Sequence, residues 1–179
     1  MNLRPAISAD SAAIASVHVR AWQEAYHGIL PDDFLTSLSV QRRADWWATQ
    51  LADPAIAQGV LVVTDDSNQV VGFASAGPAR GEGTDYLGEL YAIYLLQSHQ
   101  GKGFGRALFQ AAAAYLDRGG LHSMMLWVLK DNPTRGFYEH LGGELFSEQA
   151  LEIGSQKVLE VAYGWRDLAP FLQSNLTSK

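Results

Sequence analysis

The chain has 179 residues, a formal net charge of −6 at pH 7 and no cysteine. A chain of this length can bury one sizeable core, so a single domain over residues 1–179 is expected. The negative charge disfavours nucleic-acid binding, because it would repel the phosphate backbone. The lack of cysteine excludes disulfides and thiolate chemistry.

Metal and membrane binding are also disfavoured. The five histidines are scattered without the spacing of metal ligands, so no metal site is expected. The N-terminus lacks the pattern of a secretion signal, and no apolar run approaches the roughly 20 residues of a membrane-spanning helix. The sequence therefore predicts a cytoplasmic protein that does not contact a membrane.

The first third of the chain is mainly helical in pattern. Apolar residues at helical spacing predict one helix over residues 8–28 and another over residues 31–53, where an Asp-Pro pair interrupts it. Residues 41–43 are expected on a solvent-exposed face of the second helix. Trp22 and Tyr26 lie four residues apart near the end of the first helix. They are either two core aromatics or one wall of a substrate pocket.

Seven strands are expected, over residues 3–7, 59–64, 69–75, 86–96, 124–129, 145–150 and 158–163. The second and third are joined by a polar turn and predict a hairpin. The fourth strand is long enough to need a bulge and continues an antiparallel meander. A helix from Gly105 to the glycine pair at 119–120 leads to the fifth strand, so the fourth and fifth strands should be parallel.

A glycine-rich turn joins the fourth strand to this helix. Glycines at such a junction let backbone N–H groups approach a ligand, and the helix N-terminus adds partial positive charge. The turn therefore predicts an anion site for phosphate. It lacks the Gly-Lys-Ser/Thr of a P-loop and the third glycine of a dinucleotide fingerprint. Its glycines and basic residues are Gly101, Lys102, Gly103, Gly105 and Arg106.

A second informative block runs over residues 132–143. Asn132 is a strong N-cap, and Pro133 fits the first position of a short helix that Gly142 ends. These local roles account for the three residues without any ligand. They do not account for why so short a helix follows a buried strand directly and presents Tyr138.

Together the two blocks resemble the GNAT superfamily of acyl-CoA N-acyltransferases. Gln100-x-x-Gly103-x-Gly105 is similar to its pyrophosphate loop, and the pattern N-P-x-x-x-F-Y-E-x-L-G-G over 132–143 is similar to the segment after its fifth strand. The similarity covers residues 56–165, and residues 21–35 and 160–168 resemble a subgroup of small bacterial members. The resemblance implies a mixed α/β fold: a mainly antiparallel central sheet with one parallel pair that splays apart, and flanking helices.

The resemblance also implies acetyl-CoA as cosubstrate and assigns its contacts. Asn132 matches a residue that contacts the pantetheine arm, and Tyr138 matches a tyrosine that protonates the leaving thiolate. The backbone of Ile93, Tyr94 and Leu95 matches strand positions that hydrogen-bond this arm in the manner of an added strand. The pyrophosphate would lie on Gln100, Gly101, Lys102, Gly103, Phe104, Gly105 and Arg106.

Acyl transfer to an amine requires a base for the ammonium and a donor for the tetrahedral oxyanion. Glu89 is the favoured base, because it opens the fourth strand, an odd place for a charge unless it faces a cavity or a sheet edge. An exposed strand-end glutamate remains the alternative. A backbone N–H of Ile93 or Leu95 would hold the oxyanion. Weaker candidates for the base are Asp85, Glu24 and His27.

The sequence thus predicts an N-acetyltransferase whose primary-amine acceptor attacks acetyl-CoA directly, since no Ser-His-Asp or Cys-His arrangement is indicated. A non-catalytic acyl-CoA sensor and a nucleotide-binding module are the alternatives. The acceptor stays open, and the acidic net charge slightly favours a cationic one by steering. A homodimer through exposed strand edges is also expected.

Overall fold

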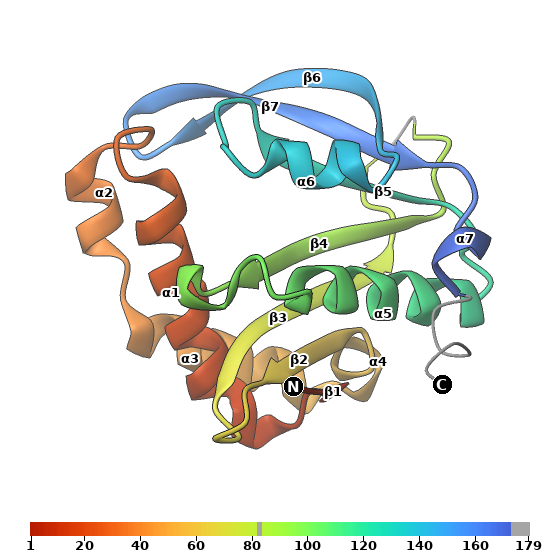
Figure 1. The fold of residues 1–179 in the computed structure, drawn as a ribbon. Coiled ribbons are helices and arrows are strands. Elements are labelled where there is room, and N and C mark those ends of the chain that lie inside the picture. Colours follow the sequence, from red (N-terminus) through yellow and green to blue (C-terminus); the bar gives the residue numbers. More distant parts are fainter. Residues whose placement is uncertain (82–83, 173–179) are drawn as a thin grey trace.

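The computed structural model describes residues 1–81 and 84–172, and its centre is a seven-stranded sheet (Figure 1). The strand order is β1-β2-β3-β4-β5-β7-β6. Only β4 and β5 are parallel neighbours, which confirms the predicted mainly antiparallel sheet with one parallel pair. The strands are β1 (Asn2–Pro5), β2 (Val60–Thr64), β3 (Val70–Pro78), β4 (Gly88–Leu95), β5 (Met124–Leu129), β6 (Glu144–Ile153) and β7 (Gln156–Trp165).

Helices cover both faces of the sheet. The helices are α1 (Ser11–Tyr26), α2 (Asp32–Ser37), α3 (Val40–Ala52), α4 (Pro54–Ala57), α5 (Phe104–Arg118), α6 (Arg135–His140) and α7 (Ala169–Leu172), with 3₁₀ turns η1 (Ser8–Asp10) and η2 (Gln97–His99). On one face, Leu108 and Phe109 of α5 belong to the main core with Leu90 of β4. On the other, Ile14 of α1 and Trp47 of α3 pack in a second core with strand residues of β2 and β3.

The single helix predicted over residues 31–53 is wrong, because the chain breaks it into α2 and α3. Leu38 and Ser39 are extended, with ψ of 117° and 118°. The Ser39 hydroxyl accepts the backbone N–H of Arg42 at 3.2 Å, so Ser39 is the N-cap that starts a new helix. The break lets α3 pack against α1 over one face of the sheet.

A β-bulge distorts β4 near its middle. Ser75 of β3 pairs with Ala92, whereas the next residue, Ala76, pairs with Leu90. Tyr91 is therefore the extra residue on β4, and the predicted bulge is confirmed. Bulges re-aim side chains and are frequent beside active sites.

The pairing of β4 with β5 is short. Only Gly88 with Met124 and Glu89 with Met125 form register pairs. Beyond these two pairs the strands diverge, and Figure 1 shows β4 running away from β5 and β7. From residue 90 onward, β4 thus has no neighbouring strand on this side.

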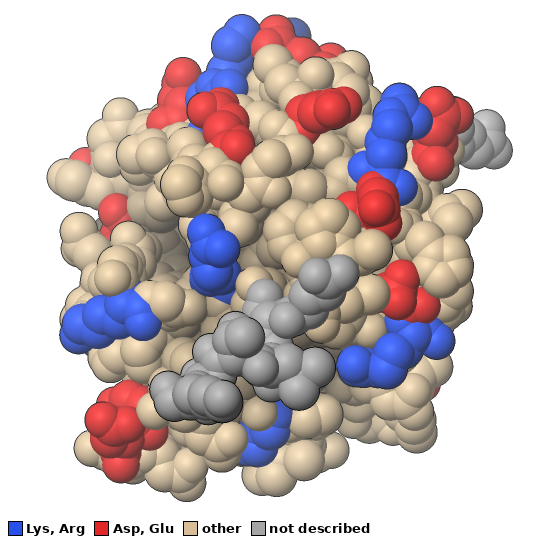
Figure 2. Space-filling model, turned by 45° about the vertical axis from the view of Figure 1, so that its right-hand side comes forward, with Lys and Arg blue, Asp and Glu red and all other residues tan. Residues whose placement is uncertain are grey.

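Charged side chains are mixed in sign on one face of the molecule. On the face shown in Figure 2, acidic and basic side chains are interspersed among uncharged ones, without an extended basic field. None of the helices in residues 1–81 and 84–172 is both long enough and apolar enough to cross a bilayer. Within the same residues, no group of three or more side chains is arranged to hold a metal ion.

Candidate active site

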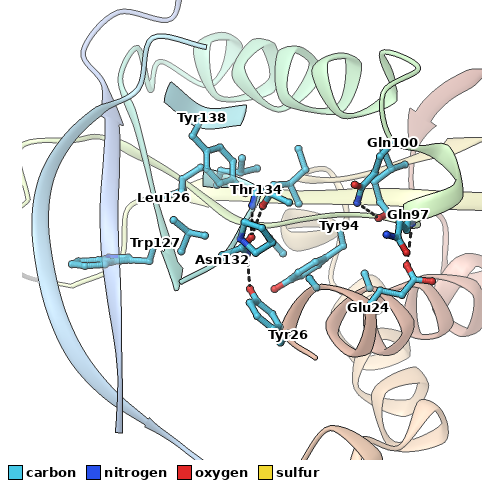
Figure 3. Close-up of a pocket in the computed structure, with 18 of the residues that line it drawn as sticks. Glu24, Tyr26, Tyr94, Gln97, Gln100, Leu126, Trp127, Asn132, Thr134 and Tyr138 are labelled. Carbon is cyan, nitrogen blue, oxygen red and sulfur yellow. Dashed lines mark hydrogen bonds between the residues drawn. The ribbon is translucent and has the colours of Figure 1, made fainter. Parts of the chain in front are cut away.

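A cleft opens where β4 and β5 diverge, and its volume is about 170 Å³ (Figure 3). We call it the β4–β5 cleft. The diverging strands leave the cleft-facing edge of β4 without a partner strand, so an extended ligand can add there as a strand does. Its lining residues include Glu24, Tyr26, Leu90, Tyr91, Ala92, Ile93, Tyr94, Leu95, Gln97, Gln100, Leu126, Val128, Asn132, Thr134 and Tyr138.

The glycine-rich turn lies between β4 and α5, next to this cleft. Gly101 and Gly103 have φ of +72° and +86°, a conformation that other residues rarely adopt. Gly103 is also the N-cap of α5. Apart from the glycine itself and its two chain neighbours, no atom of the described chain lies within 4 Å of the position where a Cβ would stand on either residue. The space above both glycines is therefore open to a ligand.

The polar side chains of this turn make few hydrogen bonds with the described part of the chain. Gln100 lines the cleft, and its amide donates to the Leu95 carbonyl at 3.3 Å. The Lys102 ammonium donates to a backbone carbonyl of η2 at 2.9 Å. Lys102 and Arg106 are both exposed, so their charges face the solvent side of the turn. A phosphate at the turn would meet these cations together with the N-terminal dipole of α5.

Tyr138 projects from α6 into the cleft (Figure 3). It is 7% exposed, and its hydroxyl has no hydrogen-bond partner among the residues that the structure describes. Burial, with a smaller contribution from Tyr26, raises the pKa of this hydroxyl above its ordinary value. Tyr138 is therefore a protonated phenol with an uncommitted O–H, as a proton donor requires.

Asn132 joins the two walls of the cleft. Its side-chain amide donates to the Tyr26 hydroxyl at 3.2 Å, and its carbonyl accepts from the backbone N–H and hydroxyl of Thr134 at 2.8 and 2.7 Å. The expectation that Asn132 is the N-cap of the following helix is wrong, because α6 begins at Arg135. Asn132 instead closes a turn and ties it to the end of α1.

Glu89 is buried rather than exposed at the strand end, with 3% of its surface accessible. Both carboxylate oxygens accept hydrogen bonds from Arg80, from Nη2 at 2.6 Å, from Nε at 3.2 Å and from the backbone N–H at 2.9 Å. Glu89 does not line the β4–β5 cleft. The Arg80 side chain therefore occupies the Glu89 carboxylate, which does not face the cleft directly.

Of the three weaker base candidates, Glu24 alone lines the β4–β5 cleft. Asp85 is exposed and lines neither this cleft nor the second cavity described below. His27 is exposed and lies 3.5 Å from Asp32. Glu24 lines the cleft, but its carboxylate accepts from the Gln97 backbone N–H at 3.0 Å and from an arginine of α1 at 2.9 Å. Glu24 therefore holds the start of η2.

A second cavity of about 540 Å³ lies between α1, α3 and the β3–β4 side of the sheet. We call it the α3-side cavity. It shares Tyr91, Ala92 and Tyr94 with the β4–β5 cleft, so the bulge of β4 stands where both meet. Its other lining residues include His18, Trp22, Arg43, Trp46, Trp47, Gln50, Ser75, Arg80 and Tyr115.

The two aromatic residues that were considered together on α1 line different cavities. Trp22 lines the α3-side cavity and Tyr26 lines the β4–β5 cleft, with their ring centroids 5.0 Å apart. Arg43 was expected on a solvent-exposed face, which is wrong, because it is half-buried and lines the cavity. Its spacing could have shown this, since it stands four residues before Trp47 and shares its helix face.

His18 is an uncharged histidine in the wall of this cavity. Its ring lies 4.9 Å from that of Tyr94 in a stacked arrangement. Burial, and secondarily the charge of Arg43, lowers the pKa of His18 to about 3. The imidazole is thus neutral at physiological pH.

The lowered pKa of His18 predicts a loss of stability in mild acid. Between pH 6.5 and about 3 the unfolded chain binds a proton that the folded one does not, so stability is complete above pH 6.5 and falls by up to about 1.4 kcal/mol per pH unit below it. Urea unfolding of the parent and of His18→Gln at pH 7, 6 and 5 measures this difference. The decrease of the unfolding free energy with falling pH that is due to His18 should vanish in His18→Gln. It should persist in His140→Gln, which changes an exposed histidine. Equal slopes in all three proteins would contradict it.

Comparison with known proteins shows the family to which this chain belongs. The model of the acetyltransferase (GNAT) family matches residues 18–143. The N-acetyltransferase YuaI of Bacillus subtilis, described as uncharacterized, is 41% identical over 169 residues, which are 94% of this chain and 95% of that protein. The chain therefore belongs to the GNAT acetyltransferase family and is an acyltransferase.

Solved structures share the fold. The PaiA N-acetyltransferase of Thermoplasma acidophilum, in complex with coenzyme A, aligns with a TM-score of 0.66 at 20% identity, over 89% of this chain and 96% of that one. YncA of Salmonella typhimurium, solved with its cofactor acetyl-CoA, aligns with a TM-score of 0.66 at 22% identity, over 100% and 98%. These likenesses show the common architecture.

Proposed function

We propose that this protein transfers an acetyl group from acetyl-CoA to a primary amine. The observation that carries the proposal is the divergence of β4 and β5 beside a glycine-rich turn at the start of α5. The divergence leaves a strand edge for the pantetheine arm, and the turn leaves open space and positive charge for the pyrophosphate. Structural neighbours solved with coenzyme A and acetyl-CoA support this choice of cosubstrate.

The cofactor contacts follow from this arrangement. The backbone of residues 93–95 would pair with the pantetheine arm, because this edge of β4 lacks a partner strand. Residues 100–106 would hold the pyrophosphate. Asn132 would contact the arm through its amide group, of which the bond to Tyr26 uses one hydrogen. The thioester would then lie near the bulge of β4, where the cleft meets the α3-side cavity.

The chemical step is a direct attack. The amine nitrogen bonds to the thioester carbonyl carbon, the C–S bond breaks, and the products are an acetamide and the free thiol of coenzyme A. A backbone N–H of Ile93 or Leu95 would stabilise the oxyanion. Glu89 would accept the ammonium proton before attack, Tyr138 would give its proton to the leaving sulfur, and the second proton that the nitrogen loses would restore the Tyr138 phenol. Since Arg80 occupies both oxygens of Glu89, we place a water between that carboxylate and the amine.

Cofactor binding is tested by thermal unfolding. Coenzyme A at about 100 times its dissociation constant should stabilise the protein by about 2.7 kcal/mol, which raises the melting temperature by about 5–10 °C for a chain of this size. ATP and NAD should give much smaller shifts, because neither has a pantetheine arm for β4. Equal shifts with ATP and coenzyme A would favour the nucleotide-binding module.

Gly103→Val should abolish the shift, because its side chain would fill the space left open over the turn. Gly120→Val is the matched control, since Gly120 has a similar φ of +79°, equally open surroundings and a position at the other end of α5. Both variants carry similar backbone strain, and only Gly103→Val should lose the response to coenzyme A.

Release of free thiol from acetyl-CoA with an amine distinguishes an enzyme from a non-catalytic acyl-CoA sensor.

Three further assignments remain our proposals: one domain over residues 1–179, a cytoplasmic location and a homodimer. The free edges of the sheet are β1 and β6. Of these, β6 carries the exposed apolar side chains Leu145 and Phe146, so we place a second copy at β6.

A further inference from the structure

The α3-side cavity is rich in hydrogen-bond donors and cations. Arg43, Arg80, His18 and the indole of Trp47 all line it. No aspartate or glutamate lines it among the residues that the structure describes. A bound molecule would therefore find donors in this cavity and no carboxylate to pair with a second positive charge of its own.

Of the two guanidinium groups, only Arg43 is uncommitted. Arg80 donates to Glu89 and lies with its guanidinium carbon 4.2 Å from the ring centroid of Tyr91. The Arg43 side chain has neither an ion pair nor a hydrogen bond within residues 1–81 and 84–172, and its guanidinium carbon lies 5.7 Å from the ring centroid of Trp46. A half-buried cation without a counter-ion is costly unless a ligand supplies one.

Three buried nitrogen atoms in the wall are also unsatisfied, and one of them is the indole nitrogen of Trp22. Trp47 is 2% exposed, and its indole N–H has no acceptor in the described part of the chain. The Nδ1 atom of His18 is likewise buried without a partner. Most buried polar groups in folded proteins are paired, so such orphans call for an explanation. These atoms have almost no accessible surface in this conformation, so a ligand oxygen would reach the indole N–H, or the imidazole in its Nδ1-protonated tautomer, only after these side chains turn.

We propose that the acceptor is an amino acid with an apolar side chain and that its carboxylate binds Arg43 in the α3-side cavity. This inference rests on the proposed function. The amine of the acceptor then points to the bulge of β4 at Ala92, which both cavities share. Its side chain lies against the indoles of Trp22, Trp46 and Trp47. This acceptor differs from the cationic one that the net charge of the chain favours by steering.

The size and walls of the cavity suit such a molecule. Its volume of about 540 Å³ falls within the range of roughly 300–1,000 Å³ in which small-molecule sites lie. Trp46 is 46% exposed although it is a large apolar side chain, and a bound apolar group would cover it. A polyamine would instead bring its second ammonium group against Arg43.

The test compares amino acids with their own amides as acceptors. L-phenylalanine, L-tryptophan and L-leucine are each paired with the amide, which keeps the shape and removes the negative charge, and spermidine is added. Thiol release from acetyl-CoA gives kcat/KM for each. The parent should prefer each acid to its amide by about 10- to 100-fold, the usual value of a hydrogen bond to a charged group.

Arg43→Gln should bring the acid-to-amide ratio close to one, mainly through the KM of the acid. Arg42→Gln is the matched control, because Arg42 is the neighbouring arginine, is exposed and lines neither cavity. Its ratio should equal that of the parent. Melting curves without ligand show whether both variants are folded.

Other results overturn the inference. A parent ratio near one, spermidine as the best acceptor, or an unchanged ratio in Arg43→Gln would each do so while leaving an acetyltransferase. Absence of turnover with all three acids, when coenzyme A still raises the melting temperature, would also overturn it. Loss of the coenzyme A shift together with absence of thiol release with every amine would instead refute the proposed function.

Discussion

Replacing Tyr138 by phenylalanine should lower kcat by about tenfold to a thousandfold, the usual range for the loss of a general acid. If the thioester lies in the β4–β5 cleft as proposed, the leaving thiolate develops its charge there, and that charge is costly unless a donor faces it. The Tyr138 hydroxyl lines that cleft, is held protonated by burial and is uncommitted among the described residues. Steady-state thiol release at saturating amine measures the effect.

The controls separate chemistry from folding. Tyr138→Phe should keep the melting shift with coenzyme A, because it removes one oxygen and no packing. Tyr86→Phe changes another buried tyrosine, one that lines neither cavity, and should keep the parent rate. A Tyr138→Phe enzyme with the parent rate for several amines would show that water or the ammonium group of the product supplies the proton.

Glu89→Gln should lower kcat/KM by about a hundredfold to ten-thousandfold near neutral pH, the range for a lost general base. The rate should partly recover at high pH, where the acceptor amine is already neutral. The substitution keeps the shape of the side chain and one acceptor oxygen for Arg80. A pH–rate profile of the parent and the variant with one acceptor is the measurement.

Arg80 decides between two roles for Glu89, because Arg80 holds both of its oxygens. If Glu89 is the base, Arg80→Gln keeps the carboxylate and should retain more activity near neutral pH than Glu89→Gln does. If Glu89 only fixes Arg80 in the cavity wall, Arg80→Gln and Glu89→Gln should lose rate equally at every pH. The second outcome would remove Glu89 from the chemistry.

The strand order around the site could be predicted because it follows from local patterns. The apolar run before the glycine turn, the helix after it and the next buried strand fix a right-handed crossover and hence the parallel pair. The positive φ of Gly101 and Gly103 also depends on residues close in sequence. The break between α2 and α3 does not follow from the apolar spacing, which continues across it, and Ser39, a residue type that favours the N-cap, is the local signal that marks it.

The hydrogen-bond partners of Glu89 and the residues that line the α3-side cavity could not be predicted from local sequence patterns. Arg80 lies in an irregular segment nine residues before Glu89, and no periodic pattern places its side chain. His18 and Arg43 stand on different helices, and only the packing of α1 against α3 brings them to one wall. The electrostatic influence of Arg43 on His18 is likewise a product of tertiary structure.

The sheet is continuous in its strand order but nearly divided in its hydrogen bonds. Strands β1–β4 form one half and β5–β7 the other, with two register pairs between them. Proteins open in cooperative units of unequal free energy, and this seam is a natural boundary between two such units. The amide hydrogens on the cleft-facing edge of residues 90–95 should exchange quickly with solvent in the free protein. An acyl-CoA arm lying along that edge would slow this exchange, so the cosubstrate would act as the strand that completes the sheet.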